Sequence, residues 1–271
     1  MGAVQPRCRR HATRYGSPQG TAGSSQDGPA WLLSRGQEPA LDAKLGVRRA
    51  RAATLLMLAL PGSAYLYQGE ELGLHEVADL PSDVRQDPTF RRTGGREPGR
   101  DGCRVPLPWT VDGASFGFGA DGAHLPQPPW FGSHSVQAQA NDPGSTLAFY
   151  RDALRVRAQL HAVDRLDWVE TRNPEVLQFV RPGSWLSITN FGRAPIPLPA
   201  GEVAIASAPL IGDQLPQDTT AWIVQARARP RHRLTIALRR PVASGPRCST
   251  STRVDSPARQ VTRRRSFPCI S

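Results

Sequence analysis

Residues 41–60 begin with several arginines and end in an almost unbroken apolar run. The Pro-Gly pair at 61–62 ends this pattern, because proline lacks the amide that a continuing helix would use. We therefore predict a helix over residues 41–60. A short, buried, aromatic strand is expected over residues 63–67, followed by a Gln-Gly turn. A helix followed closely by a strand is typical of a parallel sheet or barrel.

A second amphipathic pattern covers residues 146–160. Its apolar positions, at 147, 150, 154 and 158, lie three or four residues apart and alternate with arginines. That spacing places the apolar residues on one face of a helix. We predict a helix that packs on the protein core through this face.

Beyond residue 163 the chain consists of short runs in which apolar and polar residues alternate. Such runs are typical of half-buried strands, and turns rich in Pro, Gly and Asn separate them. The runs cover residues 176–180, 185–189, 202–206 and 220–224. They predict a small antiparallel sheet or a β-sandwich.

Two stretches lack this periodicity. Residues 17–30 are rich in Gly, Ser, Gln and Pro and are expected to form a loop. Residues 75–145 contain nine prolines, and a connection of this length is usually functional or disordered. Its aromatic residues favour a folded loop that packs on the core, namely Trp109, Phe116, Phe118, Trp130 and Phe131.

The formal net charge of +11 is concentrated at one end of the chain. Residues 226–271 contain twelve arginines and a single acidic residue, Asp255, which leaves 22 basic and 22 acidic residues in the rest. We interpret this basic tail as a disordered extension. The alternative is an arm that binds polyanions.

We divide the chain into four parts: an irregular N-terminus (1–30), an incomplete barrel end with a long loop (31–162), a β domain (163–225) and the basic tail (226–271). No apolar run is long enough to span a bilayer, and the first ten residues lack the apolar core of a secretion signal. The four cysteines have no paired or metal-ligand spacing. We therefore expect no metal or other cofactor, no membrane partner, and a reducing, cytoplasmic location.

Three motifs occur in order along the chain. They are Tyr65-Leu-Tyr-Gln-Gly-Glu-Glu-Leu-Gly-Leu74, Leu80-Pro-Ser-Asp with Gln86-Asp-Pro88, and Gly99-Arg-Asp-Gly-Cys-Arg-Val-Pro-Leu-Pro-Trp109. Over about residues 10–224 the chain resembles the C-terminal part of α-amylase-superfamily α-glucosidases, particularly the oligo-1,6-glucosidase and actinobacterial type. The resemblance implies the last strand and active-site loop of a (β/α)8 TIM barrel, followed by a small β domain. It also implies that the catalytic carboxylates belong to strands preceding Met1.

The third motif supplies the candidate substrate-binding residues. A guanidinium carries forked donors that suit neighbouring sugar hydroxyls or a carboxylate. The resemblance implies that Arg104 contacts the glucosyl unit; the alternative is an arginine that anchors the proline-rich loop. Arg100 and Asp101 are secondary candidates, for which a local ion pair is the alternative. Glu70 and Glu71 are excluded as a catalytic pair, because adjacent strand residues point to opposite faces, whereas a retaining mechanism needs carboxylates about 5–5.5 Å apart.

The residues from His11 onward resemble the segment that follows the family's Asn-His-Asp tripeptide. The tripeptide's own positions hold Gln5, Pro6 and Arg7, and a cation there would oppose a developing oxocarbenium charge. We hypothesise that an out-of-frame reading of the codons for this motif produced residues 5–9, which the nucleotide sequence of the locus would test. No catalytic residue is therefore assigned in this chain.

These observations predict a fragment of an α-glucosidase that acts on α-glucosidic bonds of oligosaccharides and is inactive alone. Two alternatives remain open. In the first, the chain is the C-terminal half of a split glucosidase or trehalose-synthase-like transglycosylase, whose partner is an N-terminal barrel fragment. In the second, it is a basic protein that binds nucleic acid through residues 226–271. The charge distribution supports this alternative less well, because the rest of the chain is neutral.

Overall fold

The computed structural model describes residues 10–18, 27–160 and 164–225. The predictions for residues 5–9 and for the basic tail therefore lie outside the described residues. The helices, in chain order, are α1 (His11–Gly16), α2 (Asp27–Leu33), α3 (Ala43–Ala59), α4 (Pro88–Arg92), α5 (Asp101–Arg104), the 3₁₀ turns η1 (Ala114–Gly117) and η2 (Pro129–His134), α6 (Val136–Gln139) and α7 (Thr146–Leu160). The strands are β1 (Asp167–Trp168), β2 (Val176–Arg181), β3 (Trp185–Asn190), β4 (Ile196–Pro197), β5 (Glu202–Ala206), β6 (Gln214–Leu215) and β7 (Thr219–Val224).

Helix α3 confirms the helix predicted over residues 41–60. It begins where the side chain of Asp42 accepts a hydrogen bond of 2.9 Å from the Leu45 amide. This N-cap satisfies one of the amides that have no partner within the helix. The helix ends at Ala59, and its C-cap residue Leu60 directly precedes Pro61.

Helix α7 begins and ends where the sequence predicts, but its buried face differs from the predicted stripe. Leu147, Tyr150 and Ala153 are buried, whereas Leu154 is 42% exposed and Ala158 is also exposed. Each step of four residues turns about 40° beyond a full circle. Leu154 and Ala158, one and two such steps after Tyr150, therefore lie progressively further from the buried face.

Five strands form one antiparallel sheet in the order β1-β2-β3-β7-β5. The strands predicted over residues 176–180, 185–189, 202–206 and 220–224 are confirmed as β2, β3, β5 and β7. A second sheet pairs β4 with β6. The small antiparallel sheet is therefore present, while the finer prediction of a β-sandwich stays a prediction.

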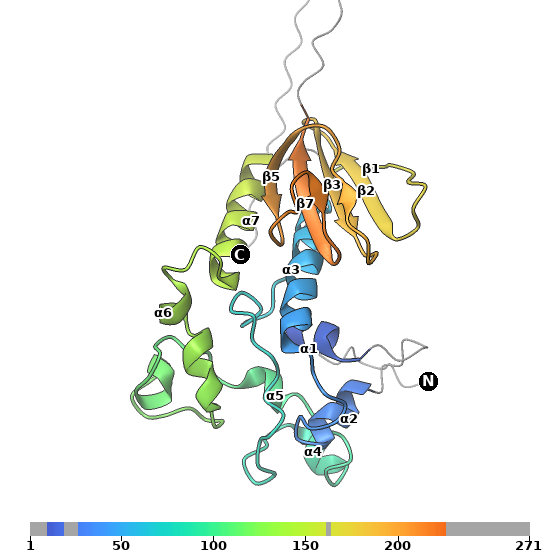
Figure 1. Cartoon of the computed structure of the whole chain (residues 1–271). Helices are drawn as coiled ribbons and strands as arrows, with labels where there is room; N and C mark the ends of the chain where they lie inside the picture. The colour runs from blue at the N-terminus through green and yellow to red at the C-terminus, as the bar shows by residue number, and fades with distance from the viewer. Residues whose placement is uncertain (1–9, 19–26, 161–163, 226–271) are drawn as a thin grey trace, which may run out of the picture. The chain divides into compact units, whose positions relative to one another are not determined.

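The sheet packs one face against α3 and α7 (Figure 1). Trp222 of β7 is fully buried there, and its indole N–H donates to the carbonyl oxygen of Leu55 at 3.2 Å. Beside it, the hydroxyl of Thr220 donates to the Ala52 carbonyl at 2.9 Å. Alternate residues of the strands face the other way and pack against Leu215 of β6. The long helix and the sheet thus share one core.

The predicted strand over residues 63–67 is not formed. The structure shows this segment without strand pairing, and Tyr65 is 88% exposed. An extended segment becomes a strand only when a neighbour takes its hydrogen bonds, and every strand pair among the described residues is antiparallel and elsewhere. The prediction of a buried strand is therefore wrong for the described chain, and the barrel remnant stays a prediction.

The long proline-rich region is folded, as its aromatic residues predict. Phe131 is fully buried in a cluster with Leu74 and Val105, and Phe116 and Trp130 pack against it. Trp109 and Phe118 are each 50% exposed, so they do not share this role. Apolar packing therefore holds a loop that has only short helices of its own.

The N-terminal part is more regular than predicted. Helix α1 and the first residues of α2 fall within residues 1–30, which the sequence analysis takes as irregular. Helix α1 lies directly on α3, because glycines at the crossing allow close approach. A Cβ on Gly46 would collide with the carbonyl oxygen of Ala12. Among the described helices, none combines the length and apolarity needed to cross a bilayer.

Candidate glucosyl-binding site

A buried carboxylate organises the loop that carries the candidate site. Asp87 is 2% exposed. One carboxylate oxygen accepts from the Thr89 amide at 2.8 Å, and the other from the Arg100 amide at 3.0 Å. Burial alone would raise the pKa of Asp87, but these hydrogen bonds and the charge of Arg104 together hold it below its ordinary value. Asp87 is therefore charged at neutral pH and closes the loop between residues 87 and 100.

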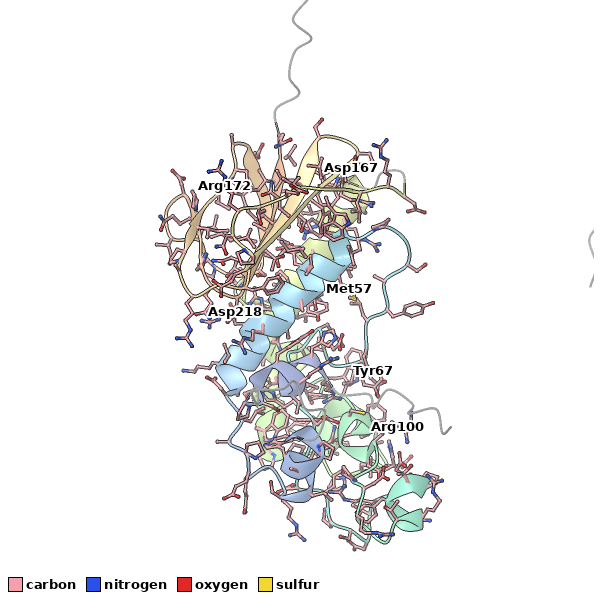
Figure 2. All side chains as sticks on the ribbon, turned by 90° about the vertical axis from the view of Figure 1, so that its right-hand side faces the viewer. Met57, Tyr67, Arg100, Asp167, Arg172 and Asp218 are labelled. Carbon is pink, nitrogen blue, oxygen red and sulfur yellow. The ribbon has the colours of Figure 1, made fainter. Side chains whose placement is uncertain are left out.

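Two arginines share this carboxylate. Nε of Arg100 lies 3.6 Å from Oδ2 of Asp87, and one terminal nitrogen of Arg104 lies 3.5 Å from the same oxygen. The two side chains are 46% and 40% exposed. Each guanidinium has five N–H donors, so most of them face away from Asp87. Figure 2 shows Arg100 at the edge of this loop.

Asp101 lies in the same loop but is turned inward. It is 1% exposed, and one of its oxygens accepts from the amides of Gln86 and Asp87 at 3.1 and 3.0 Å. The ion pair considered between Arg100 and Asp101 is replaced by the pair between Arg100 and Asp87. Asp101 thus binds the backbone that presents Asp87.

Arg85 fixes the other side of the loop, and the sequence analysis does not identify it. Its guanidinium donates to the carbonyl oxygens of Leu80, Pro98 and Ala78 at 3.2, 2.9 and 3.3 Å. Burial lowers the pKa of Arg85, while the nearby charge of Asp101 opposes that change. Two backbone segments, residues 78–80 and Pro98, therefore meet on one cation.

Arg10 ties the N-terminal helix to the same region. It is fully buried, and it donates to the carbonyl oxygens of His75 at 2.9 Å and Cys103 at 3.3 Å. Its guanidinium carbon would lie 3.0 Å from a Cβ placed on Gly69, so that turn needs a glycine. Burial lowers the pKa of Arg10, and the nearby charge of Glu76 opposes this. The only sequence signal for Arg10 is its place directly before His11.

Glu70 and Glu71 serve the turn that follows residue 67. Glu70 accepts from the Tyr67 amide at 3.2 Å, and Glu71 accepts from the Gly69 amide at 2.8 Å. The segment is a turn and not a strand, so the reason predicted for excluding Glu70 and Glu71 as a catalytic pair does not apply. The two carboxylates instead accept hydrogen bonds from backbone amides of the turn. Glu70 also lies 3.5 Å from the ring of His11.

A small hollow lies between α1, α3 and α7. His11, Arg51, Glu70 and Tyr150 contribute to its lining, and its volume is about 210 Å³ including space open to solvent. Burial raises the pKa of Tyr150, whose hydroxyl pairs with that of Thr54 at 2.8 Å. The hollow lies among α1, α3 and α7, and none of its lining residues belongs to the loop that carries Arg100 and Arg104.

The chain matches the family described as "Alpha amylase, catalytic domain" over residues 33–165. It is 31% identical over 188 residues to the trehalose synthase/amylase TreS of Mycobacterium tuberculosis, which covers 60% of this chain and 28% of that protein. It is 36% identical over 137 residues to a probable alpha-glucosidase of Rhizobium meliloti, which covers 49% of this chain and 24% of the relative.

The structure resembles the crystal structure of the α-glucosyl transfer enzyme XgtA with a TM-score of 0.58 and 29% identity. That match covers 80% of this chain and 38% of XgtA. The chain thus spans well under half the length of the proteins that it matches. The motifs, the fold and these relationships agree in relating this chain to the α-amylase family, whose catalytic domain matches residues 33–165.

Proposed function

We propose that this chain provides the glucosyl-binding loop of an enzyme that acts on α-glucosidic bonds of oligosaccharides. The relatives include a trehalose synthase and a probable α-glucosidase, so both glucosyl transfer and hydrolysis are compatible with the proposal. The observation that carries it is the position of Arg104. This arginine is 40% exposed and 3.5 Å from a buried, charged carboxylate.

The chemistry of the pair suits a sugar. The negative charge of Asp87 attracts one terminal nitrogen of Arg104, and the other donors remain for hydroxyl oxygens. Arg100 stands on the same carboxylate and would contact a neighbouring hydroxyl of the same ligand. Asp101 acts in this proposal as a positioning residue, because one of its oxygens accepts from two backbone amides.

Bond cleavage needs more than this loop supplies. A retaining mechanism uses one carboxylate as nucleophile and another as acid and base. Asp87 and Asp101 are both buried and occupied by backbone amides. We therefore propose that the chain alone binds glucosyl groups without hydrolysing them. Release of nitrophenol from a nitrophenyl α-glucoside by the pure chain would contradict this.

Titration calorimetry with maltose tests the binding proposal. We compare the full chain with Arg104→Lys, which keeps the charge and removes the planar fork. The matched control is Arg172→Lys, an exposed arginine in the turn between β1 and β2 (Figure 2). We expect maltose binding that Arg104→Lys weakens at least about tenfold, in the range of a lost charged hydrogen bond. Equal affinity in all three proteins would refute the role of Arg104.

A second candidate is one half of a split enzyme, and the unpaired segment 63–67 favours it. Tyr65 and Leu66 are 88% and 39% exposed, and an unpaired extended segment can accept a strand from another chain. The probe is the part of XgtA that this chain does not cover. We expect it to bind the full chain, and Leu66→Asp to abolish binding. Phe191→Asp, at an exposed residue directly after β3, should leave binding intact. Absence of binding, or equal loss in both variants, would refute this partner.

We also propose a cytoplasmic location. The four cysteines lack the paired spacing of a disulfide framework, and Cys103 is buried. Fractionation of cells that express the chain tests this, and recovery in the secreted fraction would contradict it.

A further inference from the structure

The loop that follows the candidate site presents two aromatic residues to solvent. Trp109 and Phe118 are each 50% exposed, and Val111 between them is 43% exposed. Large aromatic side chains usually bury most of their surface. Exposed apolar groups gathered on one loop therefore point to a surface with a ligand.

Backbone hydrogen bonds hold Trp109 from two sides. Its amide donates to the Phe116 carbonyl at 2.7 Å, and its own carbonyl accepts from the Gln137 amide at 2.9 Å. The next amide, that of Thr110, also donates to Phe116 at 2.9 Å. The Gln137 side chain then accepts from the Val111 amide at 3.0 Å. An exposed indole on a backbone fixed in this way loses little freedom when it binds.

The turn between the two aromatic residues is strained. Ser115 and Phe116 have φ of 51° and 47°, in the left-handed region that residues with a Cβ rarely adopt. Such strain persists only where the surrounding contacts impose it, and it is concentrated at functional sites. Here the strained turn brings Gly117, the residue before Phe118, back to Trp109, since a Cβ on Gly117 would lie 3.4 Å from that of Trp109.

The loop is also continuous with the candidate site. Only residues 105–108 separate Arg104 from Trp109, and two of them are prolines. Five residue steps span at most about 18 Å. The aromatic pair is therefore within reach of the next few units of a sugar chain whose end lies at Arg104.

We propose that Trp109 and Phe118 bind a further glucosyl unit of an α-linked glucan, beyond the unit held by Arg104. A glucopyranose ring has an apolar face of C–H groups and a rim of hydroxyls. The flat face of an indole or phenyl ring can pack against the C–H face of the sugar. Water or nearby polar groups can form hydrogen bonds with its hydroxyls. The inference rests on the proposed function, and it specifies a ligand longer than a disaccharide.

Calorimetry with maltose and maltoheptaose on the full chain tests this inference. Trp109→Ala and Phe118→Ala are compared with Trp168→Ala and Phe191→Ala, whose aromatic residues are 61% and 52% exposed in the sheet region. We expect Trp109→Ala to weaken maltoheptaose binding about tenfold, in the range of one aromatic contact. Its maltose affinity, both controls and near-UV circular dichroism should stay unchanged.

The outcomes separate this inference from the proposed function. Maltoheptaose binding that is unaffected by Trp109→Ala and Phe118→Ala refutes the aromatic site, even where Arg104→Lys weakens maltose binding. Maltoheptaose binding that depends on Trp109 but not on Arg104 refutes the proposed function alone. Trp109→Phe guards against misfolding, because it keeps an aromatic face and should recover most of the lost affinity. Failure of that recovery in a folded variant also counts against the stacking role.

Discussion

Replacing Asp87 by Asn tests how strongly one carboxylate holds the site loop. The substitution keeps the shape of the side chain and removes its charge. The new amide oxygen can still accept from the Thr89 amide. Its NH₂ group then faces the Arg100 amide, where two donors meet without an acceptor.

The structure sets the size of the effect. Leaving one buried donor unpaired costs about 1–3 kcal/mol. The contacts with Arg100 and Arg104 are half-exposed and therefore add only about 0–1 kcal/mol each after solvent screening. We expect Asp87→Asn to lower the free energy of unfolding by about 1–5 kcal/mol. The affinity for maltose should fall as well, because Arg104 loses the charged partner that positions its guanidinium.

Urea unfolding followed by circular dichroism measures this loss. The control is Asp152→Asn, which removes the exposed i,i+3 pair with Arg155 and should change stability by less than about 0.5 kcal/mol. The charged form of Asp87 stabilises the fold above its ordinary pKa of 3.8, and this stability is lost as the pH falls through the lower folded-state pKa. The difference between wild type and Asp87→Asn should therefore shrink below about pH 4. A loss at pH 7 no larger than that of the control would refute the reasoning.

Three further changes test the fold. Gly46→Ala should lower the free energy of unfolding by about 1–3 kcal/mol, because its Cβ would collide with the carbonyl oxygen of Ala12. The control Gly119→Ala places its Cβ in open space and should cost far less. Equal melting temperatures of the two variants would contradict this. Trp222→Ala should cost about 3–5 kcal/mol, since a fully buried indole is lost; a urea midpoint near wild type would argue against the shared core. Burial lowers the pKa of His75 to about 4, so its neutral form stabilises the fold above the ordinary pKa of 6.5, and that contribution fades as the pH falls towards 4. His75→Gln should therefore flatten the pH dependence of stability between those values, and an unchanged slope in urea titrations would contradict the assignment.

Local periodicity predicts the elements that bury their own apolar face. Strands β2, β3, β5 and β7 fall in this class, because their apolar residues alternate. Helix α7 is predicted in extent by its spacing, though not in its exact buried face, and α3 by an apolar run that stops at Pro61. The segment 63–67 shows the limit of this reasoning. Its composition favours a strand, but a strand also needs a hydrogen-bonded neighbour, and none of the described residues provides one.

The sequence nominates residues for the candidate site but does not reveal how they are connected. The motif that ends at Trp109 identifies Arg100 and Arg104, yet their partner is Asp87, which lies 13 and 17 residues earlier. That contact depends on how the loop closes, and sequence spacing does not determine it. The role of Arg10 is still harder to predict from the sequence, because a buried arginine that donates to backbone carbonyls produces no sequence pattern of its own.

A crystal structure of the full chain grown with maltose would test the central claim most directly. We predict a glucosyl unit whose hydroxyl oxygens lie about 2.7–3.2 Å from the guanidinium nitrogens of Arg104, with Asp87 still behind them. A sugar bound elsewhere on the chain, or a site beside Arg104 that stays empty at saturating maltose, would contradict the account.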